Sequence, residues 1–337
     1  MPANSTAVAE NSPAYTQLPD LASERLGGAV IAANDEFFAP KESLIKAVPP
    51  EWREGEYTER GKWMDGWETR RRRTPGFDWA IVRLGRPGVV KGVVIDTSYF
   101  TGNYPEQASI DACSIDNSLA LDRVTGGEVR WEPILEKVQL KGDTQNFFET
   151  RVSSRVTHLR FSIFPDGGVA RLRVHGQVVP DEKIFAEGRE ADLAALENGG
   201  LVISASDMHY GNPQNMIMPG RSTHMGDGWE TKRRRGPGHD WTIVQLARRG
   251  ILNRIEMDTD HFKGNAPGKC MLEYADAGSG AFDGARAKWI ALLPETPVEP
   301  HARHSWDITA DPATHVRLNI YPDGGVARLR LIGRSAP

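Results

Sequence analysis

The chain has 337 residues, of which 39% are hydrophobic and 26% charged, a balance typical of a globular protein with room for two domains. The formal net charge is −4, so there is no basic excess to hold a nucleic acid backbone, and we expect no nucleic acid partner. No apolar stretch approaches the roughly 18 residues that a membrane helix needs, so no membrane partner is expected.

The amino-terminal segment, residues 1–19, lacks both the basic start and the apolar core of a secretory signal. Its alanine, serine, asparagine and proline content predicts a disordered leader. Further along the chain there are two cysteines, Cys113 and Cys270. We expect both to be buried, unpaired thiols, which suit a reducing compartment and predict a cytoplasmic protein.

Two long phrases occur twice in the chain. Asp65–Trp79 reads DGWETRRRRTPGFDW, and Asp227–Trp241 reads DGWETKRRRGPGHDW, with 12 of 15 positions identical at a separation of 162. The phrase PDGGVARLR stands at Pro165–Arg173 and again, unchanged, at Pro322–Arg330, a separation of 157. A period of this length is the size of a whole domain, so the sequence predicts a tandem duplication of one fold.

The repeat sets the expected boundaries. We expect a leader at 1–19, a first repeat at 20–176, a charged linker with a short helix at 177–191, and a second repeat at 192–337. The first repeat carries ten extra residues within Pro49–Trp63, which predicts an exposed loop.

The hydrophobic pattern is that of β-strands. Leu159, Phe161 and Ile163 alternate with more polar neighbours, and the same pattern recurs over residues 316–321. The runs at 80–84 and 89–97 are predicted as two successive short strands, as are their counterparts in the second repeat. With 34 glycines and 22 prolines as turn formers, the prediction is an all-β protein made of two jelly-roll β-sandwiches.

The arginine run Arg70–Arg73 is predicted to be extended, so that alternate side chains face opposite ways. A guanidinium group can grip a carboxylate through two parallel hydrogen bonds. Lysine replaces arginine at the position equivalent to 70, so the remaining arginines are better candidates for that role. The alternative is that the arginines pair with Glu68, Asp78 and their counterparts, and tie loops to strands.

Other parts of the repeated phrases have structural and functional interpretations. Trp67, Trp229 and the tryptophans that end each phrase are expected to anchor the core. The Pro-Asp-Gly-Gly sequence predicts a tight turn that presents Asp166 or Asp323. His239 replaces a phenylalanine of the first repeat, and is either a proton donor or a tolerated surface residue.

Cofactor motifs are weak or missing from the sequence. The spacing of His301 and His304 does not indicate a metal site, and no phosphate loop or dinucleotide fingerprint is present. We therefore expect no cofactor, although a divalent metal is not excluded.

The duplicated phrases, together with the GNYPE sequence at 102–106, resemble the allantoicase (allantoate amidinohydrolase) family over about residues 20–334. The resemblance implies two sandwiches like galactose-binding domains, and assembly into homo-trimers or hexamers. It also implies a hydrolase acting on a linear amidine-type C–N bond, which converts allantoate and water to ureidoglycolate and urea in purine breakdown. A small-molecule substrate is the implied partner.

Allantoate carries one carboxylate and two neutral ureido arms, so its cleavage needs an anion holder, amide-binding groups, a proton donor and water. The expected catalytic residues are Glu68, Asp166, Glu230, His239 and Asp323. The expected substrate-binding residues are Arg71, Arg73, Asn103, Arg171, Arg233, Arg235, Asn265 and Arg328.

Two alternatives remain open from the sequence. One is a non-catalytic module that binds a small ligand or a carbohydrate. The other makes one repeat catalytic and the second an assembly platform.

Overall fold

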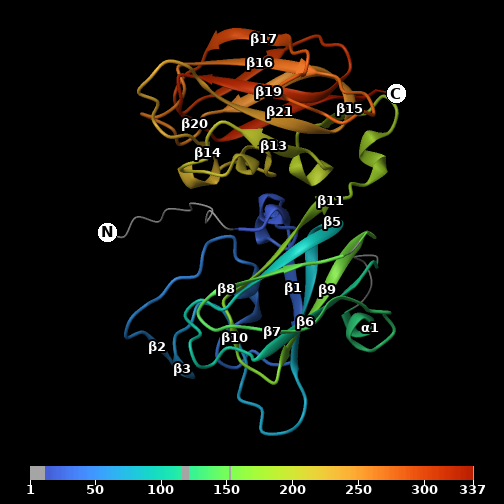
Figure 1. The fold of residues 1–337 in the computed structure, drawn as a ribbon, viewed down its shortest axis with the longest axis vertical. Helices are drawn as coiled ribbons and strands as arrows, with labels where there is room; N and C mark the ends of the chain where they lie inside the picture. Colours follow the sequence, from blue (N-terminus) through green and yellow to red (C-terminus); the bar gives the residue numbers. More distant parts are fainter. Residues whose placement is uncertain (1–11, 116–120, 152, 337) are drawn as a thin grey trace. The chain divides into compact units, whose positions relative to one another are not determined.

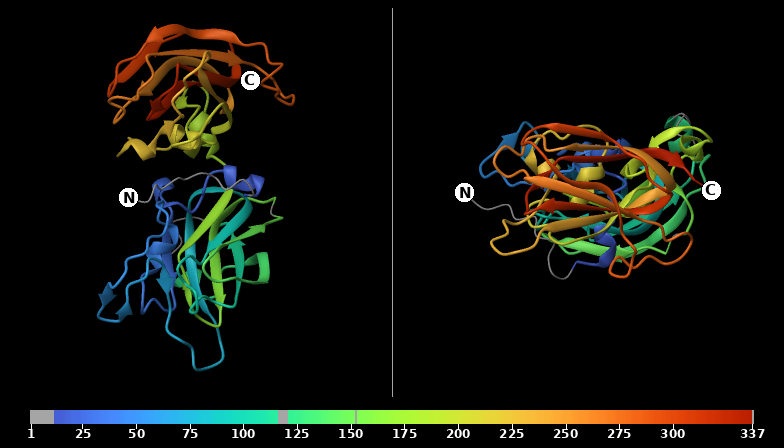
Figure 2. Two further views of the ribbon diagram at one scale, coloured as in Figure 1. Left: turned by 60° about the vertical axis from the view of Figure 1, so that its left-hand side comes forward. Right: turned by 90° about the horizontal axis from the view of Figure 1, so that it is seen from above.

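A computed structural model describes residues 12–115, 121–151 and 153–336. The chain divides into two compact units, one over Pro13–Val179 and a second that starts at Pro180. Strands joined by loops form the framework of each unit (Figures 1 and 2). In the described residues the only α-helix is α1, at Leu121–Thr125. Short 3-10 helices lie at Ala14–Gln17, Glu24–Leu26, Lys41–Ile45, Glu182–Phe185, Leu196–Asn198, Pro213–Ile217 and Met225–Asp227.

The first unit is built around one long strand, β5 (Asp78–Asp96), that takes part in two layers. Its first half pairs with β1 and β9 and its second half with β8 and β11, all antiparallel. The other strands of the main sheet are β1 (Ala29–Ala33), β6 (Gln107–Cys113), β7 (Glu132–Gln139), β8 (Gln145–Glu149), β9 (Val156–Phe164) and β11 (Arg171–Val178). Two short antiparallel pairs stand apart from it: β2 (Tyr57–Thr58) with β3 (Gly61–Lys62), and β4 (Trp67–Glu68) with β10 (Gly168–Val169).

The second unit repeats this plan around β15 (Asp240–Asp258). Its first half pairs with β13 and β19, and its second half with β18 and β21. The other strands are β12 (Glu190–Asp192), β13 (Leu201–Ala205), β14 (Trp229–Glu230), β16 (Lys269–Ala275), β17 (Ile290–Pro297), β18 (Arg303–Asp307), β19 (Ala313–Tyr321), β20 (Gly325–Val326) and β21 (Arg328–Ser335). The predicted all-β tandem duplication is confirmed.

The two strands expected at 80–84 and 89–97 form one continuous strand, which corrects the prediction. The turn-forming residues between them bend the strand without ending it, because the register shifts between Arg83 and Gly88 where β5 changes partners. A side chain at Gly88 would lie 2.5 Å from the carbonyl oxygen of Gln177, so the close approach of β11 requires glycine there.

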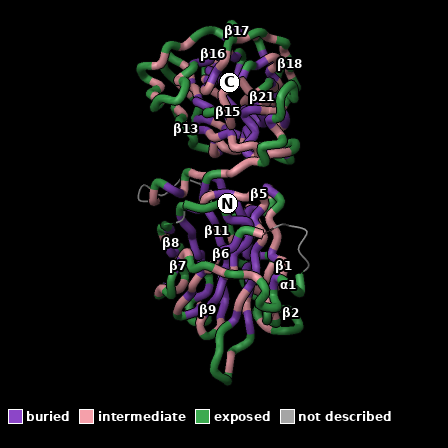
Figure 3. The backbone as a smooth tube through the Cα atoms, turned by 90° about the vertical axis from the view of Figure 1, so that its right-hand side faces the viewer, coloured by how far each residue is buried: buried purple, intermediate pink, exposed green. Residues whose placement is uncertain are grey.

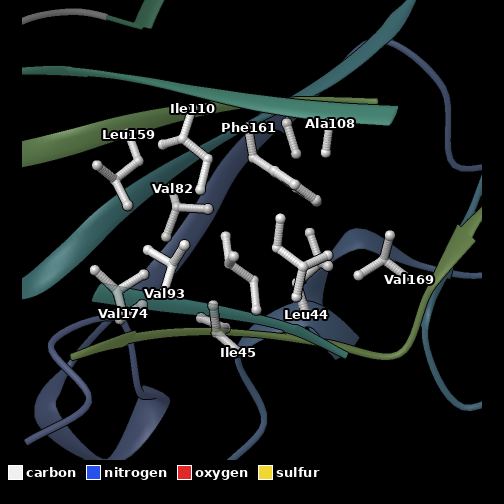
Figure 4. Close-up of a cluster of buried hydrophobic side chains, with 14 of the residues drawn as sticks. Leu44, Ile45, Val82, Val93, Ala108, Ile110, Leu159, Phe161, Val169 and Val174 are labelled. Carbon is white, nitrogen blue, oxygen red and sulfur yellow. The ribbon is translucent and has the colours of Figure 1, made fainter. Parts of the chain in front are cut away.

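The core of the first unit lies between its two layers. In Figure 4, Ala108, Ile110, Leu159 and Phe161 from β6 and β9 point toward Val93 and Val174 from β5 and β11. Leu159, Phe161 and Ile163 are fully buried and Arg160 and Phe164 are partly exposed, as the alternation predicts, whereas Ser162 is buried as well. Buried residues follow the strands of both units, and exposed residues are common in the connecting loops (Figure 3).

The amino-terminal edge of the first unit differs from the expected leader. Tyr15 is buried and donates a hydrogen bond to the carbonyl oxygen of Val93 (3.2 Å), so its ring covers the glycine at position 92. Residues 13–19 therefore belong to the unit, whereas the rest of the predicted leader, apart from Ser12, lies outside the described residues. The ten-residue insertion contains the exposed β2–β3 hairpin.

Two buried histidines occupy equivalent places in the two units. Burial lowers the pKa of His158 to about 4, and it lowers the pKa of His315 to about 4 as well. The Nδ1 atom of each ring lies next to the hydroxyl oxygen of the preceding threonine, at 2.9 Å from Thr157 in the first unit and 2.8 Å from Thr314 in the second. Both cysteines are buried as predicted, and burial raises the pKa of Cys113 to about 11 and that of Cys270 to about 12.

These histidines predict a loss of stability in mild acid. The unfolded chain takes up a proton on each histidine near pH 6.5, whereas the folded chain resists protonation down to about pH 4. The free energy of unfolding should therefore fall by about 2–3 kcal/mol per histidine as the pH decreases through this window. Urea denaturation measured between pH 7 and pH 4 checks this, and a doubly substituted His158→Asn, His315→Asn protein should show a shallower dependence. An equal dependence in both proteins would contradict it.

Candidate active site

Three segments of the first unit meet at one end of its sandwich, and we call them the Glu68 cluster: residues 67–73, 103–105 and 165–168. The short strand β4 pairs with β10 so that Glu68 lies opposite Gly168. The backbone N–H of Gly168 donates to the carbonyl oxygen of Asn103 (2.8 Å). The Pro-Asp-Gly-Gly turn therefore joins the other two segments through its backbone.

Glycine is required at the centre of this junction. Gly167 has a φ of 139°, a conformation that side chains disfavour. A Cβ atom there would lie 2.7 Å from the carbonyl oxygen of Asn103 and from the nitrogen of Pro105. The identical PDGG sequences in both repeats thus have a steric reason that the turn alone does not supply.

Glu68 is the carboxylate that this junction positions. Its Oε1 atom accepts a hydrogen bond from Nδ2 of Asn103 (2.7 Å). Burial raises the pKa of Glu68, and the hydrogen bond from Asn103 opposes that shift only in part. A carboxyl group with a raised pKa is suited to hold a proton for transfer near neutral pH. Asn103, expected to bind a ureido arm, also orients this carboxyl group.

The arginine run divides as the alternation predicts. Arg70 pairs with Asp35 (2.7 Å) and Arg72 pairs with the buried Asp78 (2.6 Å). Arg71 and Arg73 are exposed and form no ion pair within the described residues. One half of the run is therefore structural, and the other half is available to an anion.

Asp166 has a clear contact within the cluster. Its Oδ2 accepts a hydrogen bond from the backbone N–H of Arg72 (2.8 Å). Thr69 and Gly167 also exchange hydrogen bonds between their segments. Asp166 thus fixes the backbone of the arginine run, which positions Arg71 and Arg73 on either side of residue 72.

The second unit builds the same arrangement, the Glu230 cluster: residues 229–235, 265–267 and 322–325. Asn265 donates to Oε1 of Glu230 (2.6 Å), and the backbone N–H of Arg234 donates to Asp323 (2.8 Å). Arg234 pairs with the buried Asp240. The flanking Arg233 and Arg235 are exposed and have no ion pair with the described residues.

Two expected substrate-binding residues lie elsewhere. Arg171 and Arg328 are almost completely buried, at 0% and 3% exposure. Arg171 pairs with Asp65 (2.6 Å) and Arg328 with Asp227 (3.1 Å), and both also donate to backbone carbonyl oxygens. The alternation that places Arg171 opposite Leu172 is correct, but a loop covers that outer face of β11. We therefore assign these two arginines a structural role and not a role in substrate binding.

That role supports the site. Arg171 donates to the carbonyl oxygens of Val48 (3.0 Å) and Asp65 (3.1 Å), and so it anchors the segment that leads into β4. Trp67, two residues after Asp65, is fully buried, and its indole Nε1–H donates to the carbonyl oxygen of Asp35 (2.8 Å). The expected core role of Trp67 is confirmed, and Trp229 makes the equivalent contact with Asp207.

His239 belongs to a different group of contacts in the second unit. Its Nε2 lies 3.0 Å from Oδ1 of Asn319, and its ring lies over Tyr321 with centroids 4.6 Å apart. Asn319 donates to Glu273 (3.0 Å), which also pairs with Arg317 (2.5 Å). In the first unit Phe77 and Phe164 form the corresponding ring contact at 5.0 Å. The histidine thus ends a hydrogen-bonded chain that the first unit lacks at this position.

Several contacts of the clusters were not anticipated from the sequence. Asp35 and Asp207 accept from the backbone N–H groups of residues 70 and 232. The sequence did offer a signal for this contact, because Asp35 and Asp207 stand at equivalent positions of the two repeats. Within the described ranges, no group of three or more His, Cys, Asp or Glu residues is placed to hold a metal ion. The described part of the chain also contains no helix long and apolar enough to cross a membrane.

Comparison with known proteins explains the shared arrangement. The allantoicase repeat model matches residues 19–179 and again 191–336. The chain belongs to the allantoicase family. It is 49% identical to an allantoicase of Dictyostelium discoideum over 95% of this chain and 88% of that protein. It is 47% identical to a probable allantoicase of Burkholderia pseudomallei, over 97% and 98% of the two chains.

A solved structure supports the fold of this allantoicase family member. The crystal structure of allantoicase from Saccharomyces cerevisiae has a TM-score of 0.80 with this chain and 34% sequence identity. The match covers 94% of this chain and 93% of that structure. The two allantoicase repeats coincide with the two units, and each of them contains one cluster.

Proposed function

We propose that this chain hydrolyses allantoate to ureidoglycolate and urea in purine degradation. The observation that carries the proposal is the carboxyl group of Glu68, which has a raised pKa and accepts a hydrogen bond from Asn103, in the same loop cluster as the exposed Arg71 and Arg73 of an allantoicase family member. The full-length likeness to allantoicases favours this enzyme over a module that only binds a ligand.

The chemistry follows from the groups in each cluster. Exposed arginines, Arg71 and Arg73 in the first unit, hold the carboxylate of allantoate. The carboxyl group of Glu68 gives its proton to the departing urea nitrogen as the central C–N bond breaks. Water forms the new C–O bond and returns a proton to the carboxylate. The matching roles in the second unit fall to Glu230, Arg233 and Arg235.

Other residues support these groups. The side-chain Nδ2 groups of Asn103 and Asn265 orient the two glutamates, and the side-chain Oδ1 atoms can accept a hydrogen bond from a ureido N–H group. Asp166 and Asp323 fix the arginine backbones. His239 contacts Asn319 and Tyr321 and not the Glu230 cluster, so it takes the role of proton donor only in the alternative in which the second repeat alone is catalytic. We further propose a cytoplasmic homo-oligomer, trimeric or hexameric, which needs no cofactor.

The direct test is urea release from allantoate by purified protein that has been treated with a chelator. We expect saturable urea formation with ureidoglycolate as the second product. Absence of turnover before and after adding back divalent metals would overturn the proposed reaction, whereas turnover only with added metal would overturn the cofactor-free form of it. Light scattering on the same sample measures the oligomer.

A further inference from the structure

A cavity of about 470 Å³ opens at the other end of the first unit, away from the Glu68 cluster. Its walls come from the end of β6, the start of β7 and the segment before β9. Strand β9 runs from Val156, which lines the cavity, to Phe164, beside the cluster. These two residues are about 26 Å apart along an extended strand, so the cavity is a separate place on the unit.

The lining combines an apolar floor with cationic and hydroxyl groups at the mouth. The floor includes the buried Cys113 and Val156. The groups at the mouth are Arg130, Arg151, Arg155, Ser114, Ser153 and Ser154. Three guanidinium groups with nearby hydroxyls are the donors that bind carboxylate or phosphate oxygens.

The positive charge of this cavity is poorly compensated. Its single acid, Glu132, lies 3.6 Å from Arg130, and both side chains are largely exposed, which makes a weak pair. Arg155 donates to the hydroxyl of Ser114 (2.9 Å), a neutral partner. Arg151 is exposed and has no ion pair with any described residue.

The second unit shows that the fold does not require this charge. The local backbone is the same, because the N–H of Ile115 donates to Thr157 and that of Ala277 to Thr314, each at 2.9 Å. The residue before Ala277, equivalent to Ser114, is an acid, Asp276.

Asp276 receives the side chain of Arg249 through hydrogen bonds of 3.0 and 2.8 Å to one carboxylate oxygen. Proline stands at the position equivalent to Arg155. The second unit therefore pairs its arginine with an acid of its own at this place. The first unit instead leaves the positive charges of Arg151 and Arg155 without an acidic partner among the described residues, so that a ligand can pair with them.

We propose that this cavity binds a small metabolite through a carboxylate or phosphate group, at a site separate from the two glutamate clusters. The volume is within the range of pockets that hold small molecules. The guanidinium groups of Arg151 and Arg155 hold the oxyanion, and the apolar floor takes the rest of the ligand. This proposal does not depend on the identity of the reaction.

Isothermal titration calorimetry with phosphate and with malonate, at constant ionic strength in chloride, tests the site. We expect one saturable site per chain that depends on Arg151 and Arg155, in addition to binding at the exposed arginines of the two glutamate clusters. The Arg151→Gln, Arg155→Gln double variant should bind both anions at least about tenfold more weakly, since each substitution removes a charge-assisted hydrogen bond. Tighter phosphate binding indicates a phosphorylated ligand, and tighter malonate binding indicates a carboxylate.

Two further variants make the test specific. Ser114→Asp introduces the acid found in the second unit and should likewise weaken binding by at least about tenfold. Lys288→Gln removes the exposed cation at the position equivalent to Arg130 and should change nothing. Equal binding by the native protein and the double variant, or no saturable binding by the native protein, would overturn the proposal. Because binding is measured directly, failure here is distinguishable from failure to hydrolyse allantoate.

Discussion

Replacing Glu68 and Glu230 together by glutamine should reduce urea release from allantoate by about 10²- to 10⁴-fold, the usual contribution of a positioned proton donor. Glutamine keeps the shape of the side chain, and its Oε1 atom can still accept the hydrogen bond from Asn103 or Asn265. The substitution therefore removes the proton and leaves the cluster intact. The measurement is the steady-state rate of urea formation at neutral pH.

The single variants distinguish a chain with two catalytic repeats from a chain in which one repeat is catalytic and the other serves assembly. The glutamate–asparagine distances are 2.7 Å in the first unit and 2.6 Å in the second, so both clusters should work. Each single variant should then keep about half of the activity, as independent sites do. Loss of nearly all activity in one single variant would show that the other repeat serves assembly.

A control addresses the fold of these variants. Glu136 is an exposed side chain of β7, and Glu136→Gln, the same chemical change, should leave the rate unchanged because it lies outside both clusters. Full activity in the double glutamine variant, with circular dichroism matching the native protein, would exclude Glu68 and Glu230 as proton donors.

Replacing Arg171 by methionine should lower the free energy of unfolding by about 3–5 kcal/mol, because it breaks a buried ion pair and leaves the buried Asp65 with only the more exposed Lys46 as a cationic partner among the described residues. Asp65 is 7% exposed, and although burial opposes it, hydrogen bonds from Arg171 and Lys46 hold the pKa of Asp65 below its usual range. Guanidinium-induced unfolding followed by tryptophan fluorescence gives the change.

The duplicated fold supplies a matched comparison. Arg328→Met should have a similar effect on the second unit, where burial lowers the pKa of Arg328 to about 10. Arg130→Met removes a largely exposed arginine and should change stability by less than about 0.5 kcal/mol. A similarly small change for Arg171→Met would mean that its buried pair does not hold the loop.

The sequence alone predicted much of the fold because the repeat gave every pattern twice. The alternation of Leu159, Phe161 and Ile163 predicted which face is buried, and the extended arginine run predicted that residues 70 and 72 face away from 71 and 73. The resemblance carried by the duplicated phrases predicted the family. Such patterns depend on local backbone geometry and on residue order, which a sequence states directly.

Only the tertiary structure decided the fate of individual polar groups. Alternation placed Arg171 on an outer face, but a loop from residues 46–66 covers that face and turns an expected ligand contact into a buried ion pair. The contact of Asn103 with Glu68 likewise depends on a long-range approach through Gly167. Burial, and with it the pKa of Glu68, is set by segments distant in the chain, so no local pattern could give it.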